Sequence, residues 1–185
     1  MADVGVRAAR ADDAGEIGRL QVSTWRTAYP GAVPTHVLAG ISDEQATEQW
    51  AAAIASPPSA RHRVLVAYEQ SWLVGFAALA PSDDDDADAD ASTVDFAPLI
   101  VEPRWGRRGH GSRLLAAAVE HARADGATTA TTWLLVRDAA SHAFFTSAGW
   151  ERDGASRSLD MDGQPVDEVR LHADLTEESL VDGQS

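Results

Sequence analysis

Apolar and polar positions recur along this chain with two periods, one typical of strands and one typical of helices. Alternation over a few residues indicates a strand, and a spacing of three to four residues indicates a helix. The runs that predict strands are 5–9, 63–69, 72–80, 93–101, 128–136, 150–161 and 165–175. The runs that predict helices are 14–30, 33–54, 111–125 and 138–148.

Local signals place several element boundaries. Asp13 with Glu16, and Ser42 with Gln45, have the spacing of capping boxes, in which side chains satisfy the free amides at a helix start. Gly126 follows the last apolar position of the run 111–125 and predicts the C-terminal stop of that helix.

The order of the elements decides the fold class. A strand, two helices, three strands, a helix, a strand, a helix and two strands imply an α/β protein whose mixed sheet has helices on both faces. Gly75, inside the strand 72–80, indicates a bulge or a close approach to a neighbouring strand. With 185 residues, 44% of them hydrophobic, the chain suits a single domain, expected over 1–175 with a flexible polar tail at 176–185.

Composition narrows the classes of partner. The formal net charge of -14 and the pI near 4.6 argue against nucleic-acid binding, which draws its affinity from basic residues. A cationic small molecule or peptide is more plausible, although an acidic surface can serve solubility alone. Cysteine is absent, which excludes disulfides and thiolate metal sites. No segment suits a signal or a membrane span, so we expect a cytoplasmic protein without membrane contact.

An acidic run, PSDDDDADADAS at 81–92, separates two predicted strands. It cannot bury apolar surface, so we expect a mobile, solvated loop. Calcium loops space their ligands around a glycine turn, and this run does not. We therefore expect no metal here.

A second unusual segment, PRWGRRGHGS at 103–112, joins a predicted strand to a helix. Free amides and the helix dipole make such a helix start an anion site, and glycines let an anion come close. Arg107 and Arg108 add charge and Ser112 a hydroxyl, which suggests a pyrophosphate as the anion. The glycine spacing fits neither a Walker loop nor a Rossmann fingerprint. An ordinary glycine turn with surface arginines is the alternative on these residues alone.

The run VEPRWGRRGHGSRLL resembles the cofactor motif of the GNAT superfamily of acyl-CoA-dependent N-acetyltransferases. In that motif a strand ending in Val-x-Pro leads into a Gln/Arg-x-x-Gly-x-Gly/Ala turn that opens a helix. Gly109 and Gly111 match it. Gly106 stands at the Gln/Arg position, so Arg107 or Arg108 would supply the charge.

A second run, DAASHAFFTSAGW at 138–150, is similar to the family's Asn-x-x-Ala/Ser-x-x-Phe-Tyr-x-x-x-Gly-Phe/Trp helix. Asp138 replaces the asparagine, and Phe145 replaces the tyrosine that often acts as general acid. The positions in register are Ser141, Phe144, Gly149 and Trp150.

The resemblance covers roughly residues 5 to 175 and implies a mixed, mostly antiparallel sheet of about seven strands flanked by about four helices. It implies acetyl-CoA as co-substrate, and no metal. The residues it assigns to acetyl-CoA binding are Leu99, Ile100, Val101, Arg107, Arg108, Gly109, His110, Gly111, Ser112, Asp138, Ser141, Phe144 and Phe145.

The same resemblance implies direct attack of an amine on the thioester, without an enzyme nucleophile. Asp95 is the first candidate for the base, at the position where relatives often carry a glutamate. Strict alternation would put it on the same sheet face as Ala97, Leu99 and Val101. A main-chain amide near Val101 would stabilise the carbonyl oxygen. A solvated strand-edge aspartate is the alternative reading of Asp95.

Other groups have weaker claims. The alternative bases are His110, His142 and Glu102, although lone histidines are more often structural and Glu102 is expected to face water. Because the phenyl ring of Phe145 donates no proton to the leaving thiolate, the remaining donors are Ser141, Ser147 or water. The thiolate could also leave unassisted.

The acceptor pocket is expected to involve Trp25 and Tyr29, next to the Pro30–Gly31 break, while Trp50 is expected in the core. The acidic residues 83–90 would flank its mouth and attract cations. The sequence thus predicts an N-acetyltransferase for a small-molecule or peptide amine. A catalytically silent acyl-CoA-binding module is the alternative, the acidic balance counts against acyl transfer on tRNA, and a homodimer would be common among similar proteins.

Overall fold

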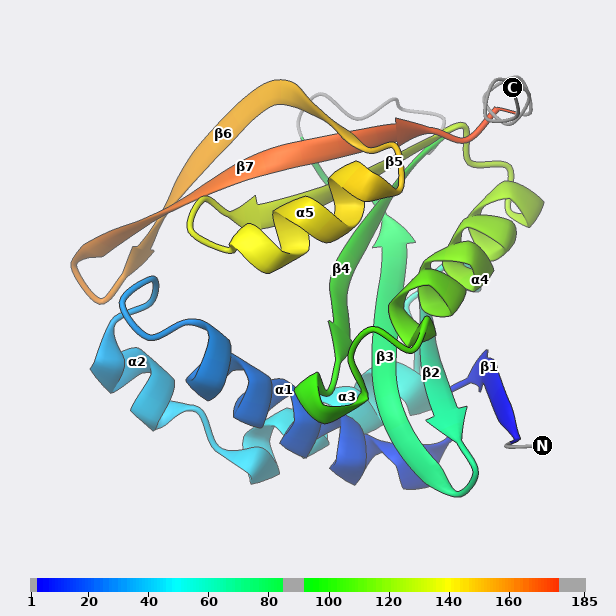
Figure 1. Cartoon of the computed structure of the whole chain (residues 1–185), viewed down its shortest axis with the longest axis horizontal. Coiled ribbons are helices and arrows are strands. Elements are labelled where there is room, and N and C mark those ends of the chain that lie inside the picture. Colours follow the sequence, from blue (N-terminus) through cyan, green and yellow to red (C-terminus); the bar gives the residue numbers. More distant parts are fainter. Residues whose placement is uncertain (1–2, 85–91, 177–185) are drawn as a thin grey trace.

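The computed structural model describes residues 3–84 and 92–176, which form a seven-stranded sheet with helices on both faces (Figure 1). The sheet order is β1-β2-β3-β4-β5-β7-β6, with one parallel pair, β4 with β5, and antiparallel pairs elsewhere. The predicted mixed, mostly antiparallel sheet is therefore confirmed. The strands are β1 (Val4–Ala8), β2 (Arg63–Glu69), β3 (Trp72–Pro81), β4 (Thr93–Val101), β5 (Thr129–Leu135), β6 (Glu151–Met161) and β7 (Gln164–Asp174).

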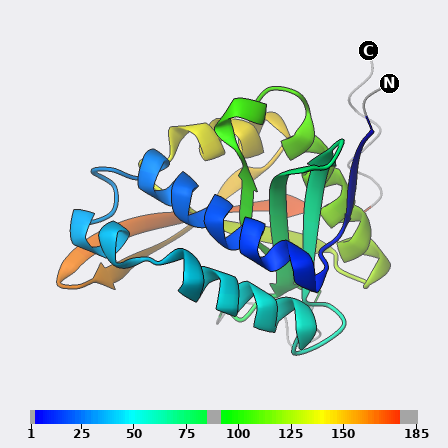
Figure 2. The same cartoon turned by 90° about the horizontal axis from the view of Figure 1, so that it is seen from below.

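The helices in the described part of the chain follow the predicted runs closely, and the stretch 33–54 divides into two. They are α1 (Ala14–Ala28), α2 (Thr35–Gly40), α3 (Asp43–Ala55), α4 (His110–Ala124) and α5 (Ala139–Ser147), with 3-10 turns η1 (Ala11–Asp13) and η2 (Pro103–Trp105). Helices α1 and α3 cover one face of the sheet, and α4 and α5 cover the other (Figures 1 and 2).

The core has one layer on each side of the sheet. Leu114 of α4 and Phe145 of α5 pack with Phe96 on one side, and Ile17 of α1 packs with Phe76 on the other. A smaller cluster joins α2 to the β6–β7 hairpin, which extends beyond the rest of the sheet (Figure 1). Because all three clusters exclude water, the segments around the β4–β5 junction are held on a rigid frame.

The predicted helix caps have different outcomes. The Ser42 hydroxyl accepts a hydrogen bond from the Gln45 amide at 3.1 Å, as predicted for α3. The capping box at Asp13 is wrong, because α1 begins without a side-chain cap. Asp13 instead accepts from the Arg10 amide at 2.6 Å and pairs with Arg7 of β1 at 2.7 Å, so it closes η1 rather than α1.

Two glycines have the roles that the sequence predicts. A Cβ atom at Gly75 would lie 2.7 Å from the carbonyl oxygen of Ile100, which is the close approach expected inside β3. Gly126 follows α4 with a φ of +85°, a conformation that favours glycine at a helix end.

Residues 85–91 and 177–185 lie outside the described residues, so the acidic loop and the C-terminal tail stay predictions. Within residues 3–84 and 92–176, none of the helices has the length and apolar character needed to span a membrane.

Candidate active site

Strands β4 and β5 pair only at their beginnings, so the sheet opens between them. The parallel register joins residues 93–95 to residues 129–131, and it extends no further. A cavity of about 380 Å³ occupies the opening. Its walls come from the end of α1, the second half of β4, β5, the start of α5 and the β6–β7 hairpin, so it gathers residues that are far apart in the sequence.

The edge of β4 that faces this opening carries main-chain groups free to bind a ligand. The carbonyl of Ile100 points toward Gly75 of β3. Because consecutive residues of a strand direct their main-chain groups to opposite edges, Leu99 and Val101 direct theirs into the opening. The structure therefore gives two candidate amides where the sequence predicts one.

A β-bulge interrupts β4 just before this edge. Leu99 pairs with Ala77 of β3, but Phe96 pairs with Leu79, so two residues of β4 lie opposite one of β3. Phe96 and Leu99 consequently both face the core layer under α4. The alternation of faces is inverted across the bulge.

Asp95 lies before the bulge and faces the side of α1 and α3, so the prediction that it shares a face with Leu99 and Val101 is wrong. It nevertheless lines the cavity. The Thr131 hydroxyl donates to its Oδ1, and the Ser82 hydroxyl donates to its Oδ2 at 3.3 Å. Burial raises the pKa of Asp95, and it outweighs the hydrogen bond from Thr131, which lowers it. A carboxylate of raised pKa suits proton transfer.

A chain of hydroxyl and carboxyl groups lines the cavity at the start of α5. The Tyr29 hydroxyl donates to Asp138 Oδ2 at 3.1 Å, and the Ser141 hydroxyl donates to the same oxygen at 2.7 Å. Asp138 also caps α5 by accepting from the Ser141 amide at 3.0 Å. Burial, followed by the charge of Asp138, raises the pKa of Tyr29. The structure thus links a predicted acceptor residue, Tyr29, to Asp138 by a hydrogen bond and, through that carboxylate, to Ser141.

The two phenylalanines of α5 have different surroundings. Phe145 is 3% exposed and packs edge-to-face on Trp150, with ring centroids 4.9 Å apart. Phe144 is partly buried, and a Cβ atom at Gly111 would lie 3.1 Å from its ring. Gly111 is therefore needed for the close packing of α4 against α5.

The segment 103–112 forms a turn that leads into α4, as its composition predicts, and anion binding at this turn stays a prediction. Arg107 and Gly109 have φ angles of +63° and +82°, and α4 begins at His110. In the first turn of α4 the amides of His110, Gly111 and Ser112 have no acceptor within the helix. Arg107 makes no ion pair with another described residue, so its charge is available to an anion.

The other charges of the turn are already paired. Arg104 pairs with Glu102 at 2.8 Å, and Arg108 pairs with Glu69 at 3.2 Å. The His110 side chain is buried and contacts Glu69 at 2.9 Å, so it does not face the anion. Only its main-chain amide is left for the predicted cofactor contact.

The remaining candidate bases and donors are engaged elsewhere. His142 Nε2 lies 3.1 Å from the carbonyl oxygen of Leu135, and the Ser147 hydroxyl donates to the carbonyl of Phe144. Glu102 is held by Arg104 rather than facing water freely. Among these groups none lines the cavity at the β4–β5 opening.

The aromatic residues of the helical face divide as expected between pocket and core. Trp25 and Tyr29 line the cavity, with ring centroids 6.1 Å apart. Trp50 packs edge-to-face on Phe76 at 5.1 Å and donates its indole N–H to Gln21. Its ring belongs to the core layer under α1 and α3.

Sequence reasoning missed the wall formed by β5, β6 and β7. Arg157 lies over the Trp133 ring at 4.2 Å and pairs with Glu168 at 2.6 Å. The Trp133 indole donates to Asp84, which also pairs with Arg170 at 2.9 Å. A tryptophan inside an apolar strand suggests core, and only the register of β5 against β4 reveals that it faces the cavity.

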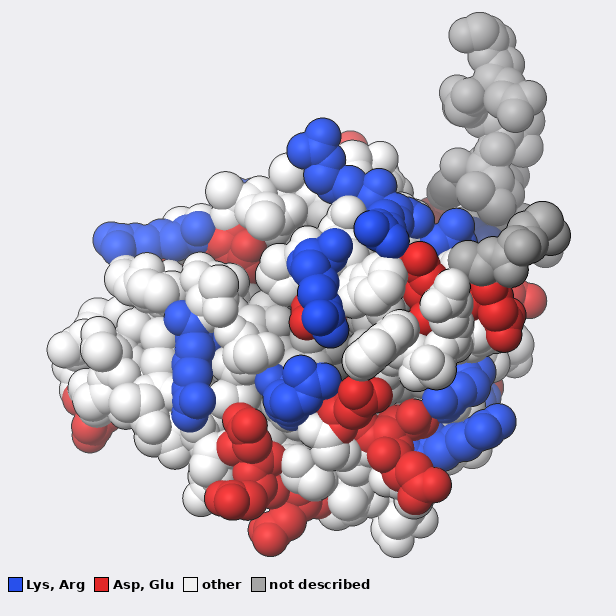
Figure 3. All heavy atoms as spheres, turned by 60° about the horizontal axis from the view of Figure 1, so that its bottom comes forward, with Lys and Arg blue, Asp and Glu red and all other residues white. Residues whose placement is uncertain are grey.

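Charged groups are mixed rather than separated on the face that carries the turn. In Figure 3 basic and acidic side chains are interspersed over this face, although the chain has a formal net charge of -14. An anion can therefore bind locally to an acidic protein.

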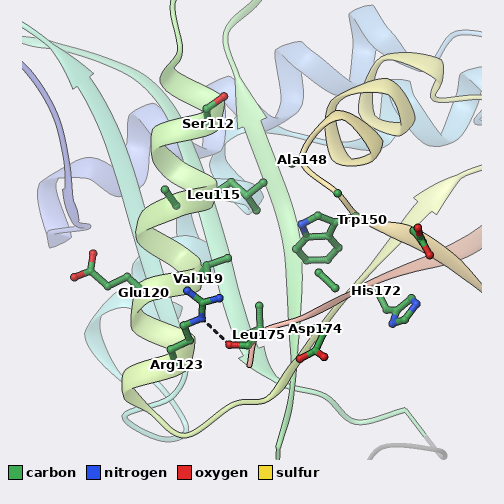
Figure 4. Close-up of a pocket in the computed structure, with 14 residues that line it drawn as sticks. Ser112, Leu115, Val119, Glu120, Arg123, Ala148, Trp150, His172, Asp174 and Leu175 are labelled. Carbon is green, nitrogen blue, oxygen red and sulfur yellow. Dashed lines mark hydrogen bonds between the residues drawn. The ribbon is translucent and has the colours of Figure 1, made fainter. Parts of the chain in front are cut away.

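A second cavity, of about 700 Å³, lies between α4 and the ends of α5 and β7 (Figure 4). Leu115, Val119 and Trp150 form its apolar wall, and Arg123 donates to the carbonyl of Leu175 across one end at 2.7 Å. It contains none of the predicted catalytic residues.

Comparison with known proteins places this geometry in context. The sequence model of the acetyltransferase (GNAT) family matches residues 22–150. A mycothiol acetyltransferase of Kineococcus radiotolerans is 38% identical over 88 residues, which are 48% of this chain and 26% of that protein. The chain therefore matches about a quarter of that relative's length.

Solved structures match over nearly the whole chain. The structure of yncA from Salmonella typhimurium with its cofactor acetyl-CoA has a TM-score of 0.67 at 19% identity, and the match covers 98% of this chain and 99% of that one. The PaiA N-acetyltransferase of Thermoplasma acidophilum, in complex with coenzyme A, has a TM-score of 0.69 at 15% identity over 93% and 99%. At these identities the likeness concerns the fold.

Proposed function

Because the chain belongs to the acetyltransferase (GNAT) family, we propose that this acyltransferase moves an acetyl group from acetyl-CoA to a primary amine of a small molecule or peptide. Transfer is direct, with both substrates bound at once. The observation that carries the proposal is the cavity between β4 and β5, whose lining contains both Asp95 and Leu99 from the open main-chain edge of β4.

The residues of the turn fit the pyrophosphate of CoA. The first-turn amides of α4 and the unpaired Arg107 offer donors and positive charge, and the left-handed Gly109 lets the backbone approach an anion. Asp138, Ser141 and Phe145 would line the path of the pantetheine arm toward β4. Acetyl-CoA supplies an acetyl group activated as a thioester.

Within the cavity each group of the chain has a distinct task. Asp95 accepts the proton of the amine, for which its raised pKa brings it nearer to neutral pH. The amide of Leu99 or of Val101 donates a hydrogen bond to the carbonyl oxygen of the acetyl group. The two amides lie about 7 Å apart along the strand, so the other one is left for the pantetheine arm. With Phe145 unable to donate a proton, Ser141 and Tyr29, which donate to Asp138 in this structure, are the candidate proton donors to the leaving sulfur. The Thr132 hydroxyl also lies on the cavity lining but donates to the carbonyl of Phe96.

The charges of the cavity favour a cationic acceptor. Four carboxylates line it, from Asp83, Asp95, Asp138 and Glu168, against the single guanidinium of Arg157. The indole ring of Trp25 adds an apolar face that can bind a cation, whereas the ring of Trp133 already contacts Arg157. An amine protonated in solution is therefore attracted before it loses its proton to Asp95.

The test is thiol release from acetyl-CoA across a panel of polyamines, aminoglycosides, amino acids and peptides with free N-termini or lysines. The chain has no cysteine, so it adds no thiol background, and its 15 basic residues are all arginines, so no lysine of its own competes as acceptor. We expect release that depends on one class of amine and falls at least 100-fold in Asp95→Asn. Asp12→Asn, on the exposed turn η1, is the matched control.

The replacement of the usual tyrosine by Phe145 favours a second candidate, a silent acyl-CoA-binding module. The two are separated by the same panel. Silence with every amine, together with calorimetric binding of acetyl-CoA, would support the module and contradict transfer.

A further inference from the structure

A carboxylate lies directly behind the anion-binding turn. Glu69, the last residue of β2, accepts from Arg108 at 3.2 Å and contacts His110 Nε2 at 2.9 Å. Its side chain is 17% exposed. Two residues of the turn thus contact one mostly buried acid, Glu69. As a carboxylate, Glu69 is no ligand for an anion, and it does not line the cavity.

The histidine of this pair is enclosed. The His110 side chain is 1% exposed, and its Nδ1 is buried without a partner among the described residues. Trp105 of η2 lies edge-on to it at 6.3 Å and also has a buried indole nitrogen without a described partner. Arg108 stacks over the same indole at 4.9 Å.

The electrostatic effect of these side chains on an anion at the turn depends on whether His110 is protonated. A neutral His110 leaves the negative charge of Glu69 balanced only by the half-exposed Arg108. The pair of Glu69 and Arg108 then gives an anion at the first turn of α4 no net attraction. A protonated His110 gives the three side chains a net positive charge that attracts the anion, so a bound anion and a bound proton favour each other.

We propose that Glu69 and His110 are a positioning pair for the turn, and that His110 takes up a proton when the pyrophosphate of CoA binds. The charged groups around the pair are Arg108 from the turn, Arg113 of α4, which donates to the carbonyl of Arg108 at 3.0 Å, and, beyond Trp105, the paired Arg104 and Glu102. The inference rests on the proposed function, because it takes the turn as the CoA site. It adds that affinity is highest at low pH and falls as the pH rises through the range in which histidines titrate.

The experiment is calorimetric titration of the wild-type chain with dephospho-CoA at several pH values between about 5.5 and 8, in pairs of buffers with different heats of ionisation. Dephospho-CoA keeps the pyrophosphate and lacks the 3′-phosphate, a group that itself titrates near pH 6. We expect proton uptake of up to one proton on binding and a loss of affinity of about tenfold from the lowest to the highest pH.

Variants assign the proton. His110→Gln and Glu69→Gln should each abolish the uptake and flatten the pH dependence, and His36→Gln, on the half-exposed histidine of α2, should leave both unchanged. Because His110 is buried, thermal melting checks folding, and proton NMR titration of the six histidines in the wild type, with and without dephospho-CoA, locates the titrating ring independently.

The outcomes are distinct. Binding without proton uptake, or uptake that persists in folded His110→Gln, would overturn the positioning pair and leave the proposed function intact. If the wild type binds neither CoA nor dephospho-CoA, the proposed function fails together with the inference.

Discussion

Replacing Arg170 by methionine should strongly destabilise the fold beside the acceptor cavity. Arg170 is 9% exposed in β7, where it pairs with Asp84 at 2.9 Å and with Asp153 at 2.6 Å. Its guanidinium also lies 5.6 Å from the ring of Trp133. One cation therefore neutralises two acids on the wall that the sequence did not reveal.

The size of the effect follows from burial of the two acids. The side chains of Asp84 and Asp153 are 15% and 18% exposed, so without Arg170 they remain charged in a poorly solvated site. Removing one partner of a buried pair costs about 3–5 kcal/mol. For a chain of this size, about 2–4 °C in Tm is lost per kcal/mol, so a decrease of roughly 6–20 °C is expected.

The assay is urea unfolding at neutral pH with melting curves on the same samples. Arg152→Met is the matched control, since Arg152 is exposed on the neighbouring strand β6, and it should change the free energy of unfolding by less than about 0.5 kcal/mol. Adding Asp84→Asn and Asp153→Asn to Arg170→Met should recover most of the loss, because neutral amides at these two described partners leave neither of them as an unpaired charge. A loss below about 1 kcal/mol, or no recovery in the triple variant, would refute the reasoning.

Three further changes test the site and its frame. Asp95→Asn should flatten the acidic limb of the pH–rate profile, because the active form is the carboxylate and burial raises its pKa. The folded state holds the proton of the Asp95 carboxyl more tightly than the unfolded state does. The stability that this proton contributes at low pH is lost as the pH rises through the raised pKa. At neutral pH the variant should therefore be more stable in urea than the wild type. Gly75→Ala should cost about 1–3 kcal/mol, because its Cβ would lie 2.7 Å from the Ile100 carbonyl, whereas Gly15→Ala, with open space in α1, should stabilise by about 0.5–1 kcal/mol. Tyr29→Phe should lower kcat about 100-fold, the lower end of the range for proton transfer, with CoA affinity unchanged by calorimetry. A loss of affinity instead would make the tyrosine a structural anchor.

The periodicity of the chain was sufficient to predict the elements and the fold class. Both ends of helix α4 lie within one residue of the predicted ends, because its apolar face and the stop at Gly126 are both local signals. Asp13 shows the limit of such signals. Its carboxylate pairs with Arg7 of β1 instead of capping α1, and that contact depends on how a strand and a turn meet in space.

The candidate site was predictable where its chemistry lies in one segment. The turn around Gly109 follows from glycines and arginines next to each other in the sequence. The face of Asp95 was not predictable, because a bulge at residues 97–98 inverts the alternation and nothing in the local sequence fixes the register against β3. Trp133 and Arg157 were missed for the same reason, since their partnership exists only once three strands are assembled.

The two ends of the site solve one electrostatic problem in opposite ways. For the proposed reaction, an acidic chain must offer positive charge to a pyrophosphate and negative charge to an amine. At the turn, Glu69 holds Arg108 in place and Arg107 stays free of ion pairs among the described residues, so positive charge faces outward. At the wall formed by β5, β6 and β7, the buried Arg170 pairs with Asp84 and Asp153, so its charge is already neutralised. Carboxylates such as Asp95 therefore outnumber cations in the cavity. The number of charges matters less than which of them are paired, and pairing is set by the register of the strands.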